Sequence, residues 1–278
     1  MNSLLSFSSL KLDIFSRNNV RLKTASGFVV ETARQYYLIT NRHVVCGGTI
    51  PDKSPQETET VPYALKTAIH IHAGQGEKMA PLAMGMRKRL TVPLYDHKDA
   101  PRWIESRVTR QGQPIVDIIA VPIRYDLTLE LLSANIPGVY MDKTSWSRIS
   151  QYWSKMSALP LSAIDADVEY GPPDRVQIIG YPFGWAPEGP DRSSSAFWRT
   201  SFIASEIYEA GRSRSDVFFV DPCAPQGMTG SPVVGLKNDR LKLLGVYSDQ
   251  STAEFGANAG YVWGAWLLKE LIPQRREG

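Results

Sequence analysis

The sequence has few cysteines and no long hydrophobic run. Cys46 and Cys223 are the two cysteines among 278 residues, which excludes a disulfide-built scaffold and fits a reducing compartment. No stretch approaches the roughly 20 consecutive apolar residues of a membrane-spanning helix. The first residues lack the basic start and the sustained apolar core of a secretory signal. We therefore expect a cytoplasmic protein that does not associate with a membrane.

The chain also has little excess of charge. Lys and Arg together number 31 and Asp and Glu 28, which gives a net charge of +3. That excess is too small to indicate a nucleic-acid partner, and none is expected. Hydrophobic residues make up 43% and charged residues 21% of the chain, as in packed globular proteins. The composition carries no signature of an oligomeric state.

Glycine and proline are plentiful, with 21 and 19 residues, and they separate short apolar segments rich in Val, Ile, Tyr and Phe. Many short strands with turns between them predict an all-β barrel or sandwich. The stretch 266–272 has helical apolar spacing and stops before Pro273, so one C-terminal helix is expected. The expected strands are 27–31, 36–40, 67–72, 115–121, 176–180, 201–205, 217–220, 232–235, 243–247 and 260–263.

The segment 126–163 is the least strand-like part of the chain and contains Pro137-Gly138. We place the boundary between two lobes there. The sequence then reads as a single domain with an N-terminal lobe over 1–135, a connection over 136–163 and a C-terminal lobe over 164–278.

Three segments carry candidate catalytic residues. In YLITNRHVV an apolar strand ends at His43, in VDIIAVP an aspartate, Asp117, opens an apolar run, and in GMTGSPVV Thr229 lies between glycines. A buried carboxylate is costly unless it is hydrogen-bonded. A nucleophilic hydrolase needs a hydroxyl, a base and a group that orients the base. The order histidine, aspartate, hydroxyl supplies these three groups, and Gly227 permits the tight turn that oxyanion-binding amides require.

Taken together, the segments GFVV…YLITNRHVV, VDIIAVPI, VQIIGYPFG, FFVDPCAPQGMTGSPVV and LLGVYSDQ resemble those of chymotrypsin/trypsin-fold serine peptidases, in the style of the intracellular bacterial trypsin-like branch. The resemblance implies two six-stranded antiparallel barrels with an active site between them. It implies His43 as general base, Asp117 as its orienting carboxylate, and the amides of Gly227 and Thr229 as oxyanion donors. The implied reaction is hydrolysis of a peptide or protein substrate, without metal or organic cofactor.

The chain departs from the family at the nucleophile, where Thr229 replaces serine. The extra methyl group makes χ1 stiff and crowds the site, so we expect an attenuated or silent peptidase. A natural threonine, a pseudo-enzyme and an engineered substitution all fit the sequence. The alternative function is a catalytically silent module that holds a peptide in its cleft. Ser231 is a less favoured nucleophile, because it lies two residues away from the oxyanion turn.

The resemblance also places a substrate pocket around Cys223 and around Tyr247 to Asp249. Cys223 would give a neutral, medium-sized floor. Asp249, if it faces inward, would favour a basic substrate side chain.

Two histidines, His70 and His72, alternate along one expected strand, so both imidazoles lie on the same face. They could bind a metal with His97 or Asp96 as a further ligand. Without a convergent cysteine or carboxylate motif, we interpret them as a surface strand face and expect no metal.

Overall fold

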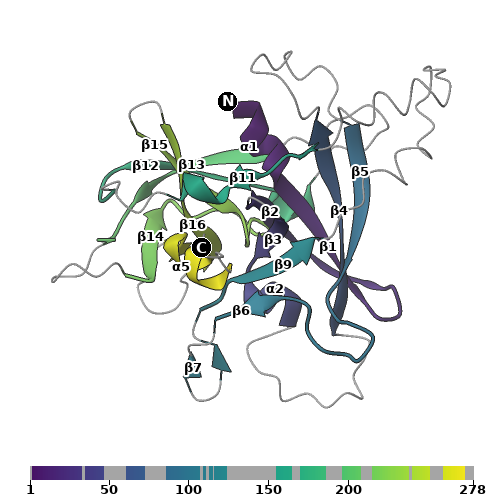
Figure 1. Cartoon of the computed structure of the whole chain (residues 1–278). Coiled ribbons are helices and arrows are strands. Elements are labelled where there is room, and N and C mark those ends of the chain that lie inside the picture. The colour runs from purple at the N-terminus through teal and green to yellow at the C-terminus, as the bar shows by residue number, and fades with distance from the viewer. Residues whose placement is uncertain are drawn as a thin grey trace, which may run out of the picture.

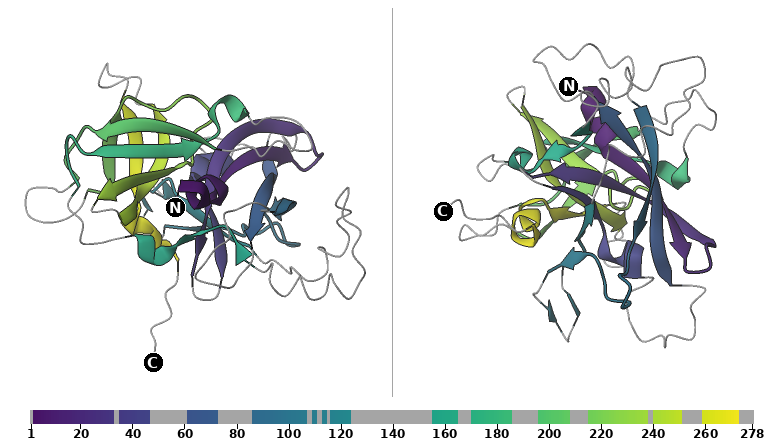
Figure 2. Two further views of the ribbon diagram at one scale, coloured as in Figure 1. Left: turned by 90° about the horizontal axis from the view of Figure 1, so that it is seen from above. Right: turned by 45° about the vertical axis from the view of Figure 1, so that its right-hand side comes forward.

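The computed structural model describes residues 2–32, 35–46, 61–72, 86–106, 109–110, 113–114, 116–123, 155–164, 170–185, 196–207, 215–237, 240–250 and 259–272. These residues form two β-lobes that lie side by side, a purple-to-blue sheet and a teal-to-yellow barrel (Figures 1 and 2). The predicted all-β class is confirmed.

The N-terminal lobe is one nine-stranded sheet with the order β10-β4-β1-β2-β3-β9-β6, in which β11 also pairs with β2 and β5 with β4. Strands β1 and β2 are antiparallel, with Ser9 opposite Phe28. The elements of this lobe are α1 (Asn2–Ser8), β1 (Ser9–Ser16), β2 (Arg21–Glu31), β3 (Tyr36–Thr40), α2 (Arg42–Cys46), β4 (Pro62–His72), β5 (Met86–Pro93), β6 (Ile104–Glu105), the hairpin β7 (Thr109–Arg110) and β8 (Gln113–Pro114), and β9 (Ile119–Ile123).

The C-terminal lobe is a closed barrel with the order β12-β13-β14-β17-β16-β15. Its strands are β12 (Arg175–Gly180), β13 (Phe197–Ile203), β14 (Val217–Asp221), β15 (Pro232–Lys237), β16 (Arg240–Gln250) and β17 (Gly260–Gly264), followed by the helix α5 (Trp266–Leu271). Short 3-10 helices span Leu161–Ala163 and Pro182–Gly184. The six-stranded C-terminal barrel and the C-terminal helix are therefore as predicted.

The N-terminal lobe differs from the six-stranded barrel expected there. Among the described residues its strands form an open sheet, and two of them come from the predicted connection 136–163: β10 (Lys155–Met156) pairs with β4, and β11 (Leu159–Pro160) runs parallel to β2. Residues 136–154 of the connection lie outside the described residues. Backbone donors and acceptors at the sheet edge thus pair with the segment that leads to the second lobe.

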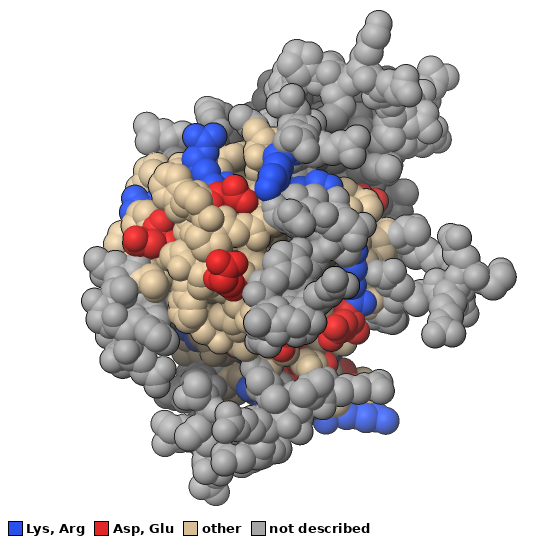
Figure 3. Space-filling model, turned by 90° about the vertical axis from the view of Figure 1, so that its left-hand side faces the viewer, with Lys and Arg blue, Asp and Glu red and all other residues tan. Residues whose placement is uncertain are grey.

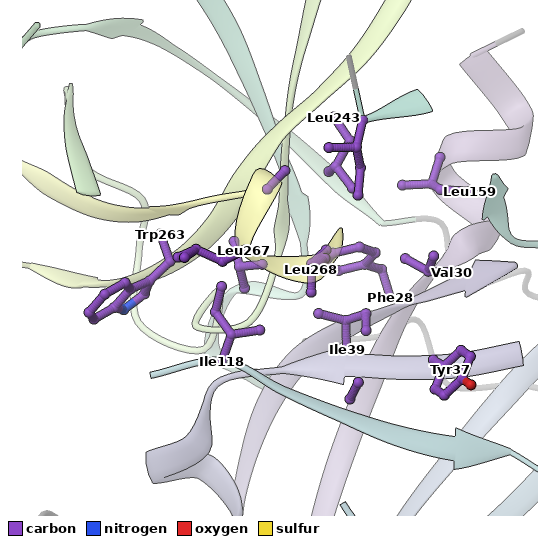
Figure 4. Close-up of a cluster of buried hydrophobic side chains, with 14 of the residues drawn as sticks. Phe28, Val30, Tyr37, Ile39, Ile118, Leu159, Leu243, Trp263, Leu267 and Leu268 are labelled. Carbon is purple, nitrogen blue, oxygen red and sulfur yellow. The ribbon is translucent and has the colours of Figure 1, made fainter. Parts of the chain in front are cut away.

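A shared hydrophobic core joins the lobes. Phe28, Val30 and Ile39 of the sheet pack in the same buried cluster as Leu267 and Leu268 of α5 (Figure 4). Of two further clusters, one fills the interior of the N-terminal lobe and the other fills the interior of the C-terminal barrel. Helix α5 is therefore a wedge between the sheet and the barrel. Its apolar side chains recur at the spacing that predicted the helix.

No helix within the described ranges is long and apolar enough to span a bilayer. On the face shown in Figure 3, described Lys and Arg side chains are interspersed with Asp and Glu over a mostly uncharged surface.

We predict that Leu268→Ala lowers the free energy of unfolding by about 2–5 kcal/mol, because Leu268 is fully buried between the lobes. The matched control is Leu236→Ala, whose side chain is 60% exposed and whose effect should stay within about 0.5 kcal/mol. Urea unfolding measures both. Equal effects of the two substitutions would contradict the wedge role of α5.

Candidate active site

The turn that presents His43 is fastened to the backbone of Asp117. Strand β3 runs into the buried Asn41, and α2 begins one residue later at Arg42. The Asn41 side-chain amide donates to the carbonyl of Asp117 at 2.8 Å, and the Arg42 N–H donates to the same oxygen at 3.3 Å. These two hydrogen bonds hold the start of α2 against the segment that precedes β9. His43 and Asp117 therefore lie side by side.

The side chains of His43 and Asp117 form a two-point contact. His43 Nδ1 lies 2.6 Å from Asp117 Oδ2, and the His43 backbone N–H donates to Oδ1 at 2.9 Å. Because an ionised carboxylate can only accept, Nδ1 carries the proton, which leaves Nε2 as the basic nitrogen. The two side chains are 31% and 25% exposed, so both are partly buried and both keep some contact with solvent.

Ser248 of β16 is a third partner in this contact that sequence reasoning did not assign. Its hydroxyl donates to Asp117 Oδ2 at 3.1 Å, across the interface between the lobes. The available sequence signal was a serine at the end of the apolar run LLGVY. That signal alone does not tell which carboxylate the serine meets.

Thr229 lies in a tight turn between β14 and β15, in which Gly227 and Gly230 have positive φ values of 92° and 88°. A Cβ on Gly227 would lie 2.7 Å from the backbone nitrogen of Phe183, so only glycine fits. Within the described part of the chain, the N–H groups of Gly227 and Thr229 donate to no acceptor, and Thr229 itself is half-buried. The turn is closed by other bonds: Met228 N to Pro225 O, Ser231 N to Met228 O, and Gly230 N to Tyr247 O.

Ser26 of β2 ties this turn to the N-terminal lobe. Its N–H donates to the Thr229 carbonyl at 2.8 Å, and its hydroxyl donates to the Gly227 carbonyl at 2.9 Å. The same hydroxyl accepts the Tyr181 N–H at 2.9 Å. A Cβ on Gly230 would lie 2.1 Å from the Ser26 carbonyl. The turn therefore packs directly on β2, the neighbour of the strand that leads to α2.

Ser231 is excluded as the nucleophile. It is fully buried, and its hydroxyl has no hydrogen-bond partner among the described residues. A Cβ on Gly180 of β12 would lie 1.9 Å from Ser231 Oγ, so the side chain points into the barrel wall. No substrate carbonyl can reach it there.

The predicted pocket residues have different positions. Cys223 is partly buried, and both it and Cys46 are free thiols. Tyr247 is 1% exposed and belongs to the barrel core, so it is not an open pocket wall. The side chain of Asp249 lies outside the described part.

The sequence left a metal site at His70 and His72 as an alternative. No group of three or more His, Cys, Asp or Glu side chains there could hold a metal ion. His70 and His72 lie on β4, but their side chains are outside the described set.

Further charged and titratable groups surround α2. Arg42 Nε donates to Glu105 Oε2 at 2.8 Å, and Lys23 Nζ donates to the His43 carbonyl at 3.1 Å. Partial desolvation lowers the pKa of Lys23, although the charge of the Asp117 carboxylate acts in the opposite direction. Burial raises the pKa of the Cys46 thiol to about 11. Cys46 is thus a neutral packing residue at physiological pH.

No protein-family model matches the chain, and no curated protein matches it. Among solved structures, the chain is similar to an inactive mutant form of Rv3671c from M. tuberculosis H37Rv, at 18% identity and a TM-score of 0.45, over 96% of this chain and 85% of that one. It is also similar to the active form of the Rv3671c protease from M. tuberculosis, at 17% identity and a TM-score of 0.44, over 99% and 85% of the two chains. These values are too low to transfer an activity or a residue role.

We predict different effects on stability for alanine substitutions of two buried serines that both approach Gly180. Ser26→Ala should lower the free energy of unfolding by about 1–3 kcal/mol, because it leaves the buried Tyr181 N–H without its acceptor. Ser231→Ala removes an unpartnered hydroxyl and should change stability by no more than about 0.5 kcal/mol. Urea unfolding checks both values. A larger loss for Ser231→Ala than for Ser26→Ala would refute this assignment.

We predict slow alkylation of Cys46 in the folded protein. A thiol with a pKa of about 11 is almost wholly protonated at pH 8, whereas an unfolded cysteine has a pKa of about 8.5. Because the thiolate is the reactive form, iodoacetamide at pH 8 should modify Cys46 on the order of 10²-fold more slowly than in urea, and faster as pH rises toward 11. Peptide mass mapping follows the site. Equal rates in folded and unfolded protein would contradict the shift.

Proposed function

We propose that this protein is a serine-type endopeptidase of the chymotrypsin/trypsin fold, with threonine at the nucleophile position. The observation that carries the proposal is the two-point contact between His43 and Asp117, with Nδ1 at 2.6 Å from the carboxylate. This contact fixes the imidazole ring and its tautomer, and makes Nε2 a general base. Such an arrangement of histidine and aspartate between two β-lobes serves nucleophilic hydrolysis.

A short chain of contacts supports Thr229 as the third member. The N–H of Gly230, the next residue, donates to the carbonyl of Tyr247, and the residue after Tyr247 is Ser248, which donates to Asp117. Two hydrogen bonds and one peptide link therefore join the turn that holds Thr229 to Asp117, the group that orients His43. The Thr229 carbonyl also accepts a hydrogen bond from the N–H of Ser26 on β2.

The proposed reaction uses these groups in sequence. The hydroxyl of Thr229 attacks the scissile carbonyl carbon while its proton passes to His43 Nε2, and the carbonyl electron pair becomes an oxyanion. The N–H groups of Gly227 and Thr229, which have no other acceptor in the described part, stabilise that charge. Collapse breaks the C–N bond, and Nε2 returns the proton to the departing amine. Water then hydrolyses the ester by the same two steps.

Asp117 acts electrostatically in this scheme. Its carboxylate stabilises the imidazolium that forms during both steps and remains ionised itself. The hydroxyl of Ser248 and the backbone N–H of His43 hold the carboxylate in place. Because charge-assisted hydrogen bonds are stronger than neutral ones, this holds the base more firmly than packing alone.

The β-branch of Thr229 limits the proposed activity. Its methyl group restricts χ1, and misplacing a reacting atom by about 1 Å costs on the order of 10²-fold in rate. The same restriction favours the second candidate function, a silent module that holds a peptide strand in the cleft. The free thiols of Cys46 and Cys223 support a reducing, cytoplasmic location for either function.

We predict that Thr229→Ser increases turnover of a fluorogenic peptide library by on the order of 10²-fold, because it removes the crowding methyl group and keeps the hydroxyl. A reactive fluorophosphonate should modify this variant once, and intact mass should increase by one phosphonyl group. Thr229→Ala and the double variant Thr229→Ser/His43→Ala are the controls, and neither should cleave or gain mass. If the folded Thr229→Ser variant neither cleaves nor reacts, the peptidase proposal fails and the binding module replaces it.

A further inference from the structure

Tyr247 connects the nucleophile turn to the group that orients the base. Its carbonyl accepts the Gly230 N–H at 2.8 Å, and its own N–H donates to the Ser231 carbonyl at 2.9 Å. The next residue, Ser248, donates to Asp117. The backbone of Tyr247 is therefore fixed immediately beside the proposed reaction centre.

The Tyr247 side chain crosses from β16 to the segment that precedes the nucleophile turn. The Ala224 N–H donates to the Tyr247 hydroxyl at 3.0 Å, and that hydroxyl lies 3.2 Å from the Ala224 carbonyl, to which it donates. Ala224 adjoins Cys223, the residue expected at the floor of the substrate pocket. Both backbone polar groups of Ala224 thus bind the Tyr247 hydroxyl, which fixes the outer end of the side chain.

The third boundary of this space is β17, where the ring leaves room for glycine alone. A Cβ on Gly260 would lie 2.5 Å from Tyr247 Cε2 and 3.2 Å from its hydroxyl oxygen. The side chain of Tyr247 is 1% exposed overall. The ring therefore fills the volume between β16, β17 and the residues around Ala224. This volume adjoins Cys223, where the family resemblance places the substrate pocket.

We propose that Tyr247 determines specificity by plugging this pocket, so that the site accepts only glycine, alanine or serine immediately before the scissile bond. Aromatic, long aliphatic and basic side chains are excluded, which replaces the expectation that Asp249 selects a basic residue. A ring held by two hydrogen bonds and close packing does not move aside for a substrate side chain. This inference rests on the proposed peptidase function.

The first test is the cleavage profile of the full chain carrying Thr229→Ser, on peptides that differ only in the residue before the scissile bond. We expect glycine, alanine and serine peptides to be cleaved at least about tenfold faster than phenylalanine, leucine and arginine peptides. Faster cleavage after any of these three large residues overturns the proposal, and this test does not require a change at Tyr247.

The second test removes the plug. Tyr247→Ala in the same background should admit phenylalanine and raise its rate relative to alanine by about tenfold or more. The matched control is Tyr247→Phe, which keeps the ring and should keep the preference for small residues. If Tyr247→Ala does not fold, Tyr247→Leu leaves part of the volume open and should admit valine. An unchanged profile in a folded variant overturns the proposal.

A binding measurement separates this inference from the peptidase proposal. Tyr247→Ala leaves a cavity with the free N–H and carbonyl of Ala224, and phenol carries the matching acceptor and donor. Added phenol should raise the melting temperature of Tyr247→Ala but not that of the parent or of Tyr247→Phe. The absence of a phenol-dependent increase overturns the plug.

Fluorophosphonate reactivity then distinguishes the two failures. If Thr229→Ser reacts but shows no preference for small residues, the peptidase function stands and the role of Tyr247 falls. If Thr229→Ser does not react although phenol stabilises Tyr247→Ala, the ring fills a pocket that does not serve peptide hydrolysis. In that case the peptidase proposal fails, and the proposed role of Tyr247 in substrate specificity fails with it.

Discussion

The geometry of the site depends on Ser26, because this residue fixes one lobe to the other. Within the described ranges it forms four hydrogen bonds outside the strand ladder. Its N–H and hydroxyl donate to the turn that holds Thr229, its hydroxyl accepts from Tyr181, and its carbonyl accepts from the Thr40 hydroxyl at 2.9 Å. Candidate catalytic groups lie on both sides of this contact, His43 in the sheet lobe and Thr229 in the barrel lobe. Reaction requires their positions to be fixed within about 1 Å.

A buried hydrophobic contact alone would not give that accuracy. Hydrophobic packing between α5 and the sheet contributes to the attraction between the lobes, but it is non-directional. The hydrogen bonds of Ser26 and Ser248 are directional, and each joins a strand of one lobe to a segment of the other lobe that holds a candidate catalytic residue. Gly230 is required at the same contact, since any side chain there would collide with the Ser26 carbonyl.

The sequence predicted the parts of the site that local patterns determine. Strand β3 has the predicted bounds, and His43 contacts Asp117, the residue that the family resemblance implied as its partner. The strand expected over 115–121 begins only at Ile119. The reason is that the backbone carbonyl and the carboxylate of Asp117 bind the turn around His43, and a residue held in this way leaves the sheet ladder.

Contacts between distant strands could not be predicted from the sequence. Strand β1 was not expected, although its burial alternates from Leu10 onward, and no role was predicted for Ser26, which adjoins the strand expected over 27–31. The role of Tyr247 depends on Gly260, because the small residue on β17 creates the space that the ring fills. Such pairs can be recognised only in the folded barrel, where residues of neighbouring strands come into contact.

The most direct test of the account is a crystal structure of the Thr229→Ser variant after reaction with a peptidyl phosphonate. The account predicts a covalent bond from the hydroxyl of residue 229 to phosphorus, a phosphonyl oxygen within hydrogen-bond distance of the amides of Gly227 and residue 229, and His43 still bound to Asp117. A phosphonyl oxygen directed away from both amides, or an adduct on another residue, would contradict it.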